Sequence, residues 1–285
     1  MKKVYLIAIA VLILVLLAFA ACAEWGDHSN VVLRFSPYTQ ESFTKASPAE
    51  CFEKLNIMLF NQAGEKVFDK VKTQTTEDDN FGTLSLQLTP GTYKVVAVGH
   101  SSKVSATIKS PEAVQFTAKD GEKLTDTFNY CGDIVVTEEK QEKVLQMKRV
   151  AAMFRLKLKD EELPASFAKM KFDYTGGSAN YNPTTGQGIT KSTQAENRLR
   201  SDSNVYEIYT FPYLSETGTL QITASALDGA GNVLIKHTFK DVPMRVNTIT
   251  SYEGEFFGDM PGEVTATTVG FTVDPAWATT NTYTF

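Results

Sequence analysis

The chain is poor in the residues from which metal and thiol chemistry is built. Only three histidines and three cysteines occur among its 285 residues, which leaves little material for a transition-metal site. The sequence also lacks a G-x-S-x-G elbow, a P-loop, an H-E-x-x-H motif and a C-x-x-C pair. These gaps predict a protein that is not an enzyme and that holds no metal and no cofactor. His237 shares a strand face with Val233, Ile235 and Phe239, which is typical of a partly buried histidine rather than a ligand.

A surplus of positive charge is missing as well. The formal net charge is -5 and the isoelectric point is about 5.4. Removal of a leader carrying Lys2 and Lys3 would take the net charge from -5 to -7. No basic patch stands out, so we expect no nucleic acid as partner. Hydrophobic residues at 42% and charged residues at 21% are typical of a folded globular chain.

The N-terminus has the order of features found in a secretory signal. Lys2 and Lys3 precede an apolar run from Val4 to Phe19, and small residues lead to Cys22. Small residues directly before a cysteine resemble the bacterial lipobox, although Phe19 departs from the usual leucine. We therefore expect residues 1–21 to be a signal peptide and Cys22 to be the lipidated N-terminus. The alternative is an uncleaved membrane helix, since the run nearly reaches the length that spans a bilayer.

Residues 22–29 are expected to form a lipidated tether. Glu24 and Asp27 follow the cysteine closely and are similar to the surface-export signal of Bacteroides-type lipoproteins. Two or more acyl chains attach a protein stably, whereas one chain holds it only reversibly. The expected location is the outer membrane, lipid-anchored and facing the cell surface. A merely solvated tether is the alternative reading of the acidic residues.

Two cysteines remain after the tether, Cys51 and Cys131. An exported compartment permits a disulfide between them, and closing that loop would stabilise the fold by roughly 4 kcal/mol in the chain-entropy model. Two unpaired, buried cysteines are the equally weighted alternative.

The body of the chain alternates apolar and polar residues with a period of two. Leu84 to Leu88 carries leucine at every second position, and the same alternation recurs from Phe154 to Leu158 and from Leu220 to Ala226. Pro90-Gly91 and the glycine-rich segment 228–232 are typical turns between such strands. Strands recur about every ten residues without a long amphipathic helix, which predicts an all-β protein built as sandwiches.

About seven strands fall on each side of residue 148, enough for two sandwiches in tandem. We place an N-terminal β-sandwich at residues 30–147 and a C-terminal β-sandwich at residues 148–285, with the charged stretch 137–148 between them. Residues 175–204 are rich in Gly, Ser, Thr and Asn, which predicts a functional loop or a partly ordered insertion.

Several segments along the chain occur in a characteristic order and spacing. They are Cys22, Phe43–Lys45, Leu88–Gly99, Arg149–Leu158, Phe172–Ser178 and Val242–Phe257. Together, over nearly the whole chain, they resemble one known family, the FimB-type fimbrial anchor (fimbrillin-associated anchor) lipoproteins of Bacteroides-type bacteria.

The resemblance implies two transthyretin-like β-sandwich domains and an outer-membrane lipoprotein at the base of a fimbria. Such a protein anchors the fibre and limits its length through strand-complementation contacts with fimbrial stalk subunits. Stalk subunits of this kind lose their first strand to a protease and receive a neighbour's C-terminal strand. The anchor is expected to keep both its first strand and its lipid.

Residues near the tether fit that mechanism. Val31, Leu33 and Phe35 alternate with polar or outward positions, as a groove-filling strand should. Arg34 and Lys45 are candidate sites for a trypsin-like protease, with a solubilising role as the alternative for Arg34. The tail from residue 264 to 285 is either the last strand of the second sandwich or a donor strand for another subunit.

Two other classes of function stay open. The first is a stalk or tip subunit, or an adhesin, of the same superfamily, which would be cleaved near its first strand. The second is a surface glycan-binding lipoprotein, which predicts an exposed aromatic platform.

Overall fold

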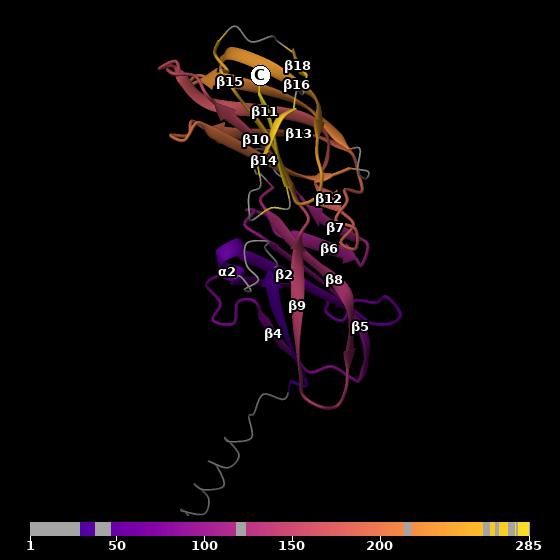
Figure 1. Ribbon diagram of the computed structural model, residues 1–285. Helices are drawn as coiled ribbons and strands as arrows, with labels where there is room; N and C mark the ends of the chain where they lie inside the picture. Colours follow the sequence, from indigo (N-terminus) through magenta and orange to yellow (C-terminus); the bar gives the residue numbers. More distant parts are fainter. Residues whose placement is uncertain are drawn as a thin grey trace, which may run out of the picture.

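A computed structural model describes residues 29–37, 47–117, 124–213, 218–258, 263–265, 268–272, 277 and 279–284. Within them the fold is almost entirely β-structure, arranged as two sandwiches one above the other (Figure 1). The first half contains helix α2 (Pro48–Cys51) and strands β1 (Val31–Pro37), β2 (Lys54–Phe60), β3 (Lys72–Thr75), β4 (Thr83–Leu86), β5 (Gly91–His100), β6 (Ala106–Ser110), β7 (Ala113–Phe116), β8 (Thr127–Val136) and β9 (Gln141–Arg149). The second half contains β10 (Ala152–Leu158), β11 (Phe167–Ser178), β12 (Asn180–Tyr181), β13 (Ser192–Leu199), β14 (Val205–Pro212), β15 (Thr219–Asp228), β16 (Val233–Pro243), β17 (Thr248–Gly254), β18 (Glu263–Thr265), β19 (Thr268–Thr272) and β20 (Thr279–Thr284).

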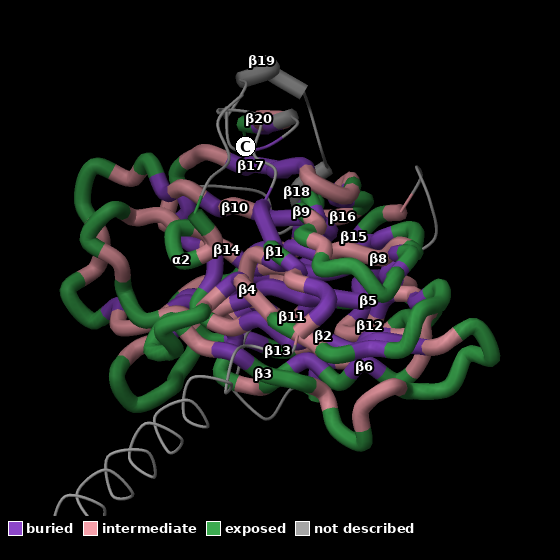
Figure 2. Tube along the Cα trace, turned by 90° about the horizontal axis from the view of Figure 1, so that it is seen from below, coloured by how far each residue is buried: buried purple, intermediate pink, exposed green. Residues whose placement is uncertain are grey.

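The first sandwich has two layers with the strand orders β4-β1-β9 and β3-β2-β5-β8. The layers join where β8 and β9 pair at Phe128–Arg149 and Asn129–Lys148. The period-two alternation decides which side chains enter the core, because successive residues of a strand point to opposite faces. The core between the layers contains Leu55, Ile57, Leu59, Val95, Ala97, Leu145 and Met147, together with residues of β1 and β8. Buried strands accordingly run through the middle of the molecule and exposed loops surround them (Figure 2).

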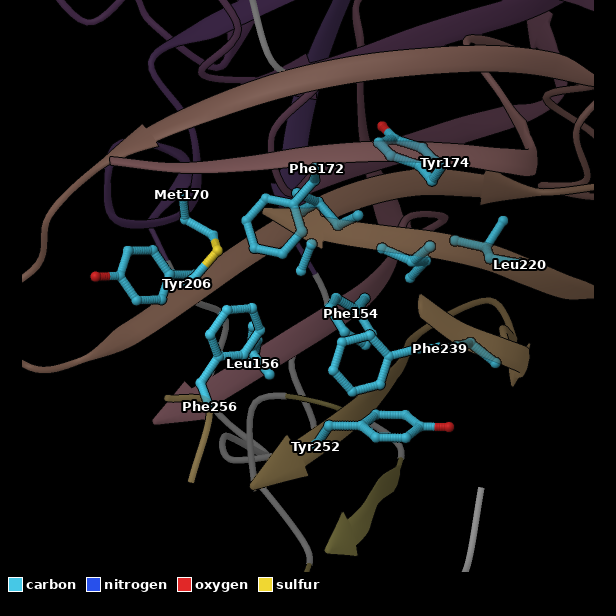
Figure 3. Packing of buried hydrophobic residues seen from close by; sticks show 14 of the residues in the cluster. Phe154, Leu156, Met170, Phe172, Tyr174, Tyr206, Leu220, Phe239, Tyr252 and Phe256 are labelled. Carbon is cyan, nitrogen blue, oxygen red and sulfur yellow. The ribbon is translucent and has the colours of Figure 1, made fainter. Parts of the chain in front are cut away.

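The second sandwich repeats this arrangement. Its layers have the orders β14-β10-β17 and β13-β11-β15-β16, and β11 joins β14 at Gly177–Pro212. In each sandwich the first strand lies antiparallel to one neighbour and parallel to the other: β1 between β4 and β9, and β10 between β14 and β17. Phe154 and Leu156 of β10 face Phe172 of β11 across the core (Figure 3). The second sandwich adds β20 and β19 beside β17, and β18 beside β16.

A third cluster joins the two sandwiches. β6 and β7 form a hairpin, and β12 of the second half pairs with β7 to make a three-stranded sheet across the junction. The outer face of the β2–β5 layer packs against this sheet. This junction cluster buries Met58, Phe60, Val96, Val98, Ala106, Ile108, Val114, Phe116, Leu124, Val150, Tyr181 and Phe211. The junction is therefore a hydrophobic core of its own rather than a flexible linker.

Two sequence predictions differ from the structure in this region. The charged stretch 137–148 is not a separating segment, because Gln141–Arg149 forms β9 of the first sandwich, with Leu145 and Met147 inward. The boundary proposed at residue 148 thus falls inside a strand. Residues 175–204, predicted to be a functional loop or a partly ordered insertion, instead contain the end of β11, then β12 and β13. Glycine is required at Gly177, where a Cβ would lie 2.1 Å from Oγ1 of Thr210.

Of the two predicted turns, one joins paired strands and the other does not. The segment 228–232 joins β15 and β16 as an antiparallel hairpin, as predicted. Pro90-Gly91 leads from β4 into β5, but these two strands lie in different layers and do not pair with each other. Local turn residues mark where a strand ends, whereas the layer that the next strand joins depends on packing across the whole sandwich.

Candidate functional site

The candidate site is the position of β1 between β4 and β9 in the first sandwich. Seven residue pairs run parallel from Val31–Gln141 to Pro37–Met147 on the β9 side. Four antiparallel pairs from Val31–Leu86 to Arg34–Thr83 lie on the β4 side. β1 is therefore hydrogen-bonded along both edges, and its removal would leave an open groove between β4 and β9.

The three residues predicted to fill this groove do so. Val31 and Leu33 are fully buried and Phe35 is 2% exposed. All three belong to the core cluster between the two layers. Burial of three such side chains contributes roughly 5–8 kcal/mol before the entropy cost of ordering the strand is counted. β1 is thus part of the first hydrophobic core and not a loose extension.

Asn30 fastens the start of β1, a role that the sequence analysis missed. Its Nδ2 donates to the carbonyl oxygens of Leu88 at 2.8 Å and Thr137 at 3.0 Å. Its Oδ1 accepts from the amide of Leu88 at 2.9 Å. Asn30 is 7% exposed, and its two bonds with Leu88 satisfy buried backbone groups. The only sequence signal was a polar residue directly before the alternating run.

Arg34 lies on the outer face of β1. Its Nε donates to Oε1 of Glu142 at 2.6 Å, and about half of each side chain is exposed. The hydrogen bond and the negative charge of Glu142 raise the pKa of Arg34. An exposed ion pair of this kind contributes little to stability. The outward, solubilising role is therefore the one that the geometry displays.

The strand pairing of β1 also determines whether a protease can reach the proposed cleavage site at Arg34. Arg34 pairs with Thr83 and with Val144 in the two neighbouring strands, so its peptide bonds lie inside a sheet while β1 is in place. A protease needs an extended segment free of its neighbours, so β1 must leave the sheet before Arg34 can be cut. Lys45 and the lipobox residue Cys22 lie outside the described residues. Over the part of the chain that the structure describes, no helix is long and apolar enough to cross a membrane.

The two remaining cysteines are free in the structure rather than disulfide-bonded. Cys51 packs against the core cluster of the first sandwich, whereas Cys131 packs against the junction cluster. The layer β2–β5–β8 separates these clusters, so the two thiols face different sides of it. Cys131 lies near Oγ1 of Thr184, with the sulfur at 3.5 Å. Both thiols are unpaired in this structure, as in the second alternative, but they are partly buried rather than buried.

His100 and His237, the two histidines among the described residues, serve the fold. His100 ends β5 as a fully buried side chain. Its Nε2 lies 2.8 Å from Oδ1 of Asn56, and its Nδ1 accepts from the amide of Ser102 at 3.1 Å. His237 is buried as predicted, with Nε2 3.0 Å from the carbonyl oxygen of Phe256. Among the described residues no group of His, Cys, Asp and Glu side chains could hold a metal ion.

The C-terminal strand lies on its own sandwich. β20 pairs in parallel with β17 from Thr248–Thr279 to Glu253–Thr284. The ring of Tyr283 stacks on that of Tyr252 with centroids 4.8 Å apart. In this structure the tail is therefore a final strand, the first of its two predicted alternatives.

Fold and site together define a class: an all-β protein of two tandem transthyretin-like sandwiches whose first strand, β1, lies paired between β4 and β9. The family model of the fimbrillin-A associated anchor proteins Mfa1 and Mfa2 matches residues 21–283. The chain belongs to this family, as the resemblance in its sequence indicated. The family is one of fimbrial anchor proteins.

Solved structures show similar folds at low sequence identity. A candidate polysaccharide-binding protein from Bacteroides thetaiotaomicron matches with a TM-score of 0.51 and 10% identity, over 72% of this chain and 78% of that one. The fimbrial anchor protein Mfa2 from Porphyromonas gingivalis matches with a TM-score of 0.42 and 13% identity, over 72% of this chain and 80% of that one. A fimbrial assembly protein from Parabacteroides distasonis matches with a TM-score of 0.41 and 10% identity, over 79% and 90%. No curated protein matches the chain.

Proposed function

We propose that the protein is an outer-membrane lipoprotein that anchors a fimbria at the cell surface and limits its length. The observation that carries the proposal is the position of β1, which is paired on both edges and buried in the first core. Cys22 would carry the lipid, and the tether 22–29 leads directly into this strand. The lipid would thus be connected through residues 22–29 to β1, which is held in the first core.

The proposed limit on the length of the fimbria depends on the same strand, β1. A subunit that has lost its first strand exposes a groove, which a neighbour's strand can fill by β-augmentation. Here β1 occupies the groove between β4 and β9, so no such site is open in the first sandwich. A fimbrial stalk subunit that contacts this protein would find no acceptor groove there, and growth at this end would stop.

The test is intact-mass and N-terminal analysis of the protein purified from outer membranes. We expect an acylated Cys22 N-terminus with residues 30–37 still attached. Cys22→Ser should remove the lipid mass and release long fimbriae into the medium. Cys131→Ser is the matched control and should leave lipidation and fimbria length unchanged. A mature N-terminus at Phe35 or Ala46 without lipid would overturn the proposal and indicate a strand-exchanging stalk subunit.

The glycan-binding alternative finds less support. It requires an aromatic platform on the surface, but the large hydrophobic side chains that are exposed among the described residues are Val135, Val144, Ile189, Leu199, Val233 and Leu234. None of these is aromatic, and aliphatic side chains do not offer the flat π-face that stacks on a sugar ring. We therefore retain the anchor as the proposed function.

A further inference from the structure

Arg149 lies at the junction of the two sandwiches, with its guanidinium held from both sides. It is the last residue of β9, and 6% of its side chain is exposed. Its Nε donates to both carboxylate oxygens of Asp126, at 2.8 and 2.9 Å. Its Nη1 donates to Oδ1 of Asn247 at 3.2 Å. Asp126 precedes β8 of the first sandwich and Asn247 precedes β17 of the second, so one side chain connects the two halves.

Two aromatic rings enclose the same guanidinium. Its carbon lies 4.7 Å from the ring centre of Phe128, which belongs to the first core, and 4.1 Å from that of Trp277. Cations over indole and phenyl faces are attracted by the ring quadrupole, most strongly when water is excluded. Trp277 directly precedes the C-terminal strand region and is 4% exposed. The C-terminal segment thus reaches back to the junction through this one indole.

Trp277 also covers one row of residues on the outer face of the second sandwich. Tyr209, Met153 and Ile249 stand side by side in the register of β14, β10 and β17. Trp277 packs on Met153 and Ile249, with Tyr209 at the edge of the cluster. Thr280 of β20 pairs with Ile249 and continues the same row. The indole therefore fixes both β20 and the end of the layer that adjoins the first sandwich.

The contact between β17 and β20 is imperfect. Three buried hydroxyl groups there have no hydrogen-bond partner among the described residues: Ser251, Tyr252 and Thr280. A buried polar group without a partner loses its bonds to water and weakens the contact that buries it. β20 is accordingly held less well by its pairing with β17 than a strand with satisfied side chains would be.

We propose that Arg149 and Trp277 form a latch that couples docking of the C-terminal strand to closure of the junction between the sandwiches. On one side of the junction the three-stranded sheet β6–β7–β12 and its cluster hold the two halves together. The latch adds a second connection between them. When β20 and Trp277 leave, Arg149 loses one of its two rings, and the connection from Asp126 to Asn247 loosens. The inference does not depend on the proposed anchoring function.

Hydrogen–deuterium exchange on the full chain tests the latch in both directions. Arg149→Met should speed exchange in β20 by about tenfold or more, although Arg149 belongs to a different strand. Trp277→Ala should speed exchange by a similar factor at the amides of Val150 and Asn247, which donate to Thr127 and Ala151 at 2.9 Å. Because coupling between two sites is reciprocal, each substitution should speed exchange at the other site.

Arg155→Met is the matched control. Arg155 forms an equivalent pair with Glu207, 2.8 Å from Nε to Oε1, on the outer face of β10. This variant should leave exchange in β20 and at the junction unchanged. If Arg149→Met fails to fold, the test compares Trp277→Phe with Trp277→Ala. Phenylalanine retains a ring beside Arg149, so Trp277→Phe should restore the slow exchange at the junction amides that Trp277→Ala loses. Faster exchange confined to β20 in Trp277→Ala, or to residues 126–149 in Arg149→Met, would overturn the latch.

Discussion

At the scale of single residues, His100 shows how burial converts a titratable group into a structural one. The ring lies edge-on to Phe116 with centroids 4.9 Å apart. The amide of Ser102 donates to Nδ1, so Nε2 carries the proton and donates to Asn56. Desolvation by burial, aided by the charge of Lys54, lowers the pKa of His100 to about 3. The neutral imidazole at the end of β5 is thus the form that contacts Asn56 of β2 and Phe116 of β7.

This arrangement predicts a pH-dependent stability. The unfolded chain binds a proton at His100 near pH 6.5 and the folded chain only near pH 3, so the stabilisation is complete above pH 6.5 and declines as the pH falls toward 3. The free energy of unfolding should decrease by about 1.4 kcal/mol per pH unit from this group. His100→Gln, measured by urea unfolding between pH 3.5 and 8, should flatten that slope. Above pH 7 the difference from the parent protein should stay constant, and a slope unchanged by the substitution would contradict the assignment.

At the scale of elements, β1 is the strand on which the proposed function depends. Leu33 is fully buried in the middle of it. Leu33→Ala removes side-chain volume from a packed core, so we expect the free energy of unfolding to fall by about 2–5 kcal/mol in urea titration. Leu199→Ala is the matched control, because Leu199 is 82% exposed and its loss should cost within about 0.5 kcal/mol. Equal effects of the two substitutions would show that β1 is not part of the stable core.

The strands themselves could be predicted from the sequence, and their partners could not. The alternating apolar positions Val31, Leu33 and Phe35 correctly predicted their own burial, because the period of two is a local property of extended backbone. The glycine-rich turn after Asp228 foretold a hairpin for the same reason. β9 was missed because its outward lysines and glutamates dominate its composition. Asn30 was missed because its three backbone partners come from positions distant in the sequence.

At the scale of the whole molecule, the junction cluster makes the two sandwiches depend on each other. Phe211 of β14 is 1% exposed and lies between Tyr181, 4.4 Å away, and Phe116 of the first half, 5.7 Å away, as measured between ring centroids. Its contacts thus connect β14 with β12 and β7. Hydrophobic contact of this extent favours cooperative unfolding of the two halves.

A substitution in the junction cluster should make the two sandwiches unfold separately. Phe211→Ala is expected to lower the free energy of unfolding by about 3–5 kcal/mol and to split one unfolding transition into two. Phe167→Ala, at an equally buried site inside the second core, should shift the transition without splitting it. Circular dichroism during urea unfolding measures both. A single transition in Phe211→Ala would show that the junction does not couple the sandwiches through this cluster.

The sequence by itself determined which side chains of each strand face a core, since that choice follows from backbone geometry and the order of polar and apolar residues. It also carried the family, whose model matches residues 21–283. Only the tertiary structure decided that β1 lies between β4 and β9, that both sandwiches share one strand order, and that Arg149 is enclosed by Phe128 and Trp277. Those pairings join residues far apart in the chain, and they are selected by the packing of whole layers rather than by any local pattern.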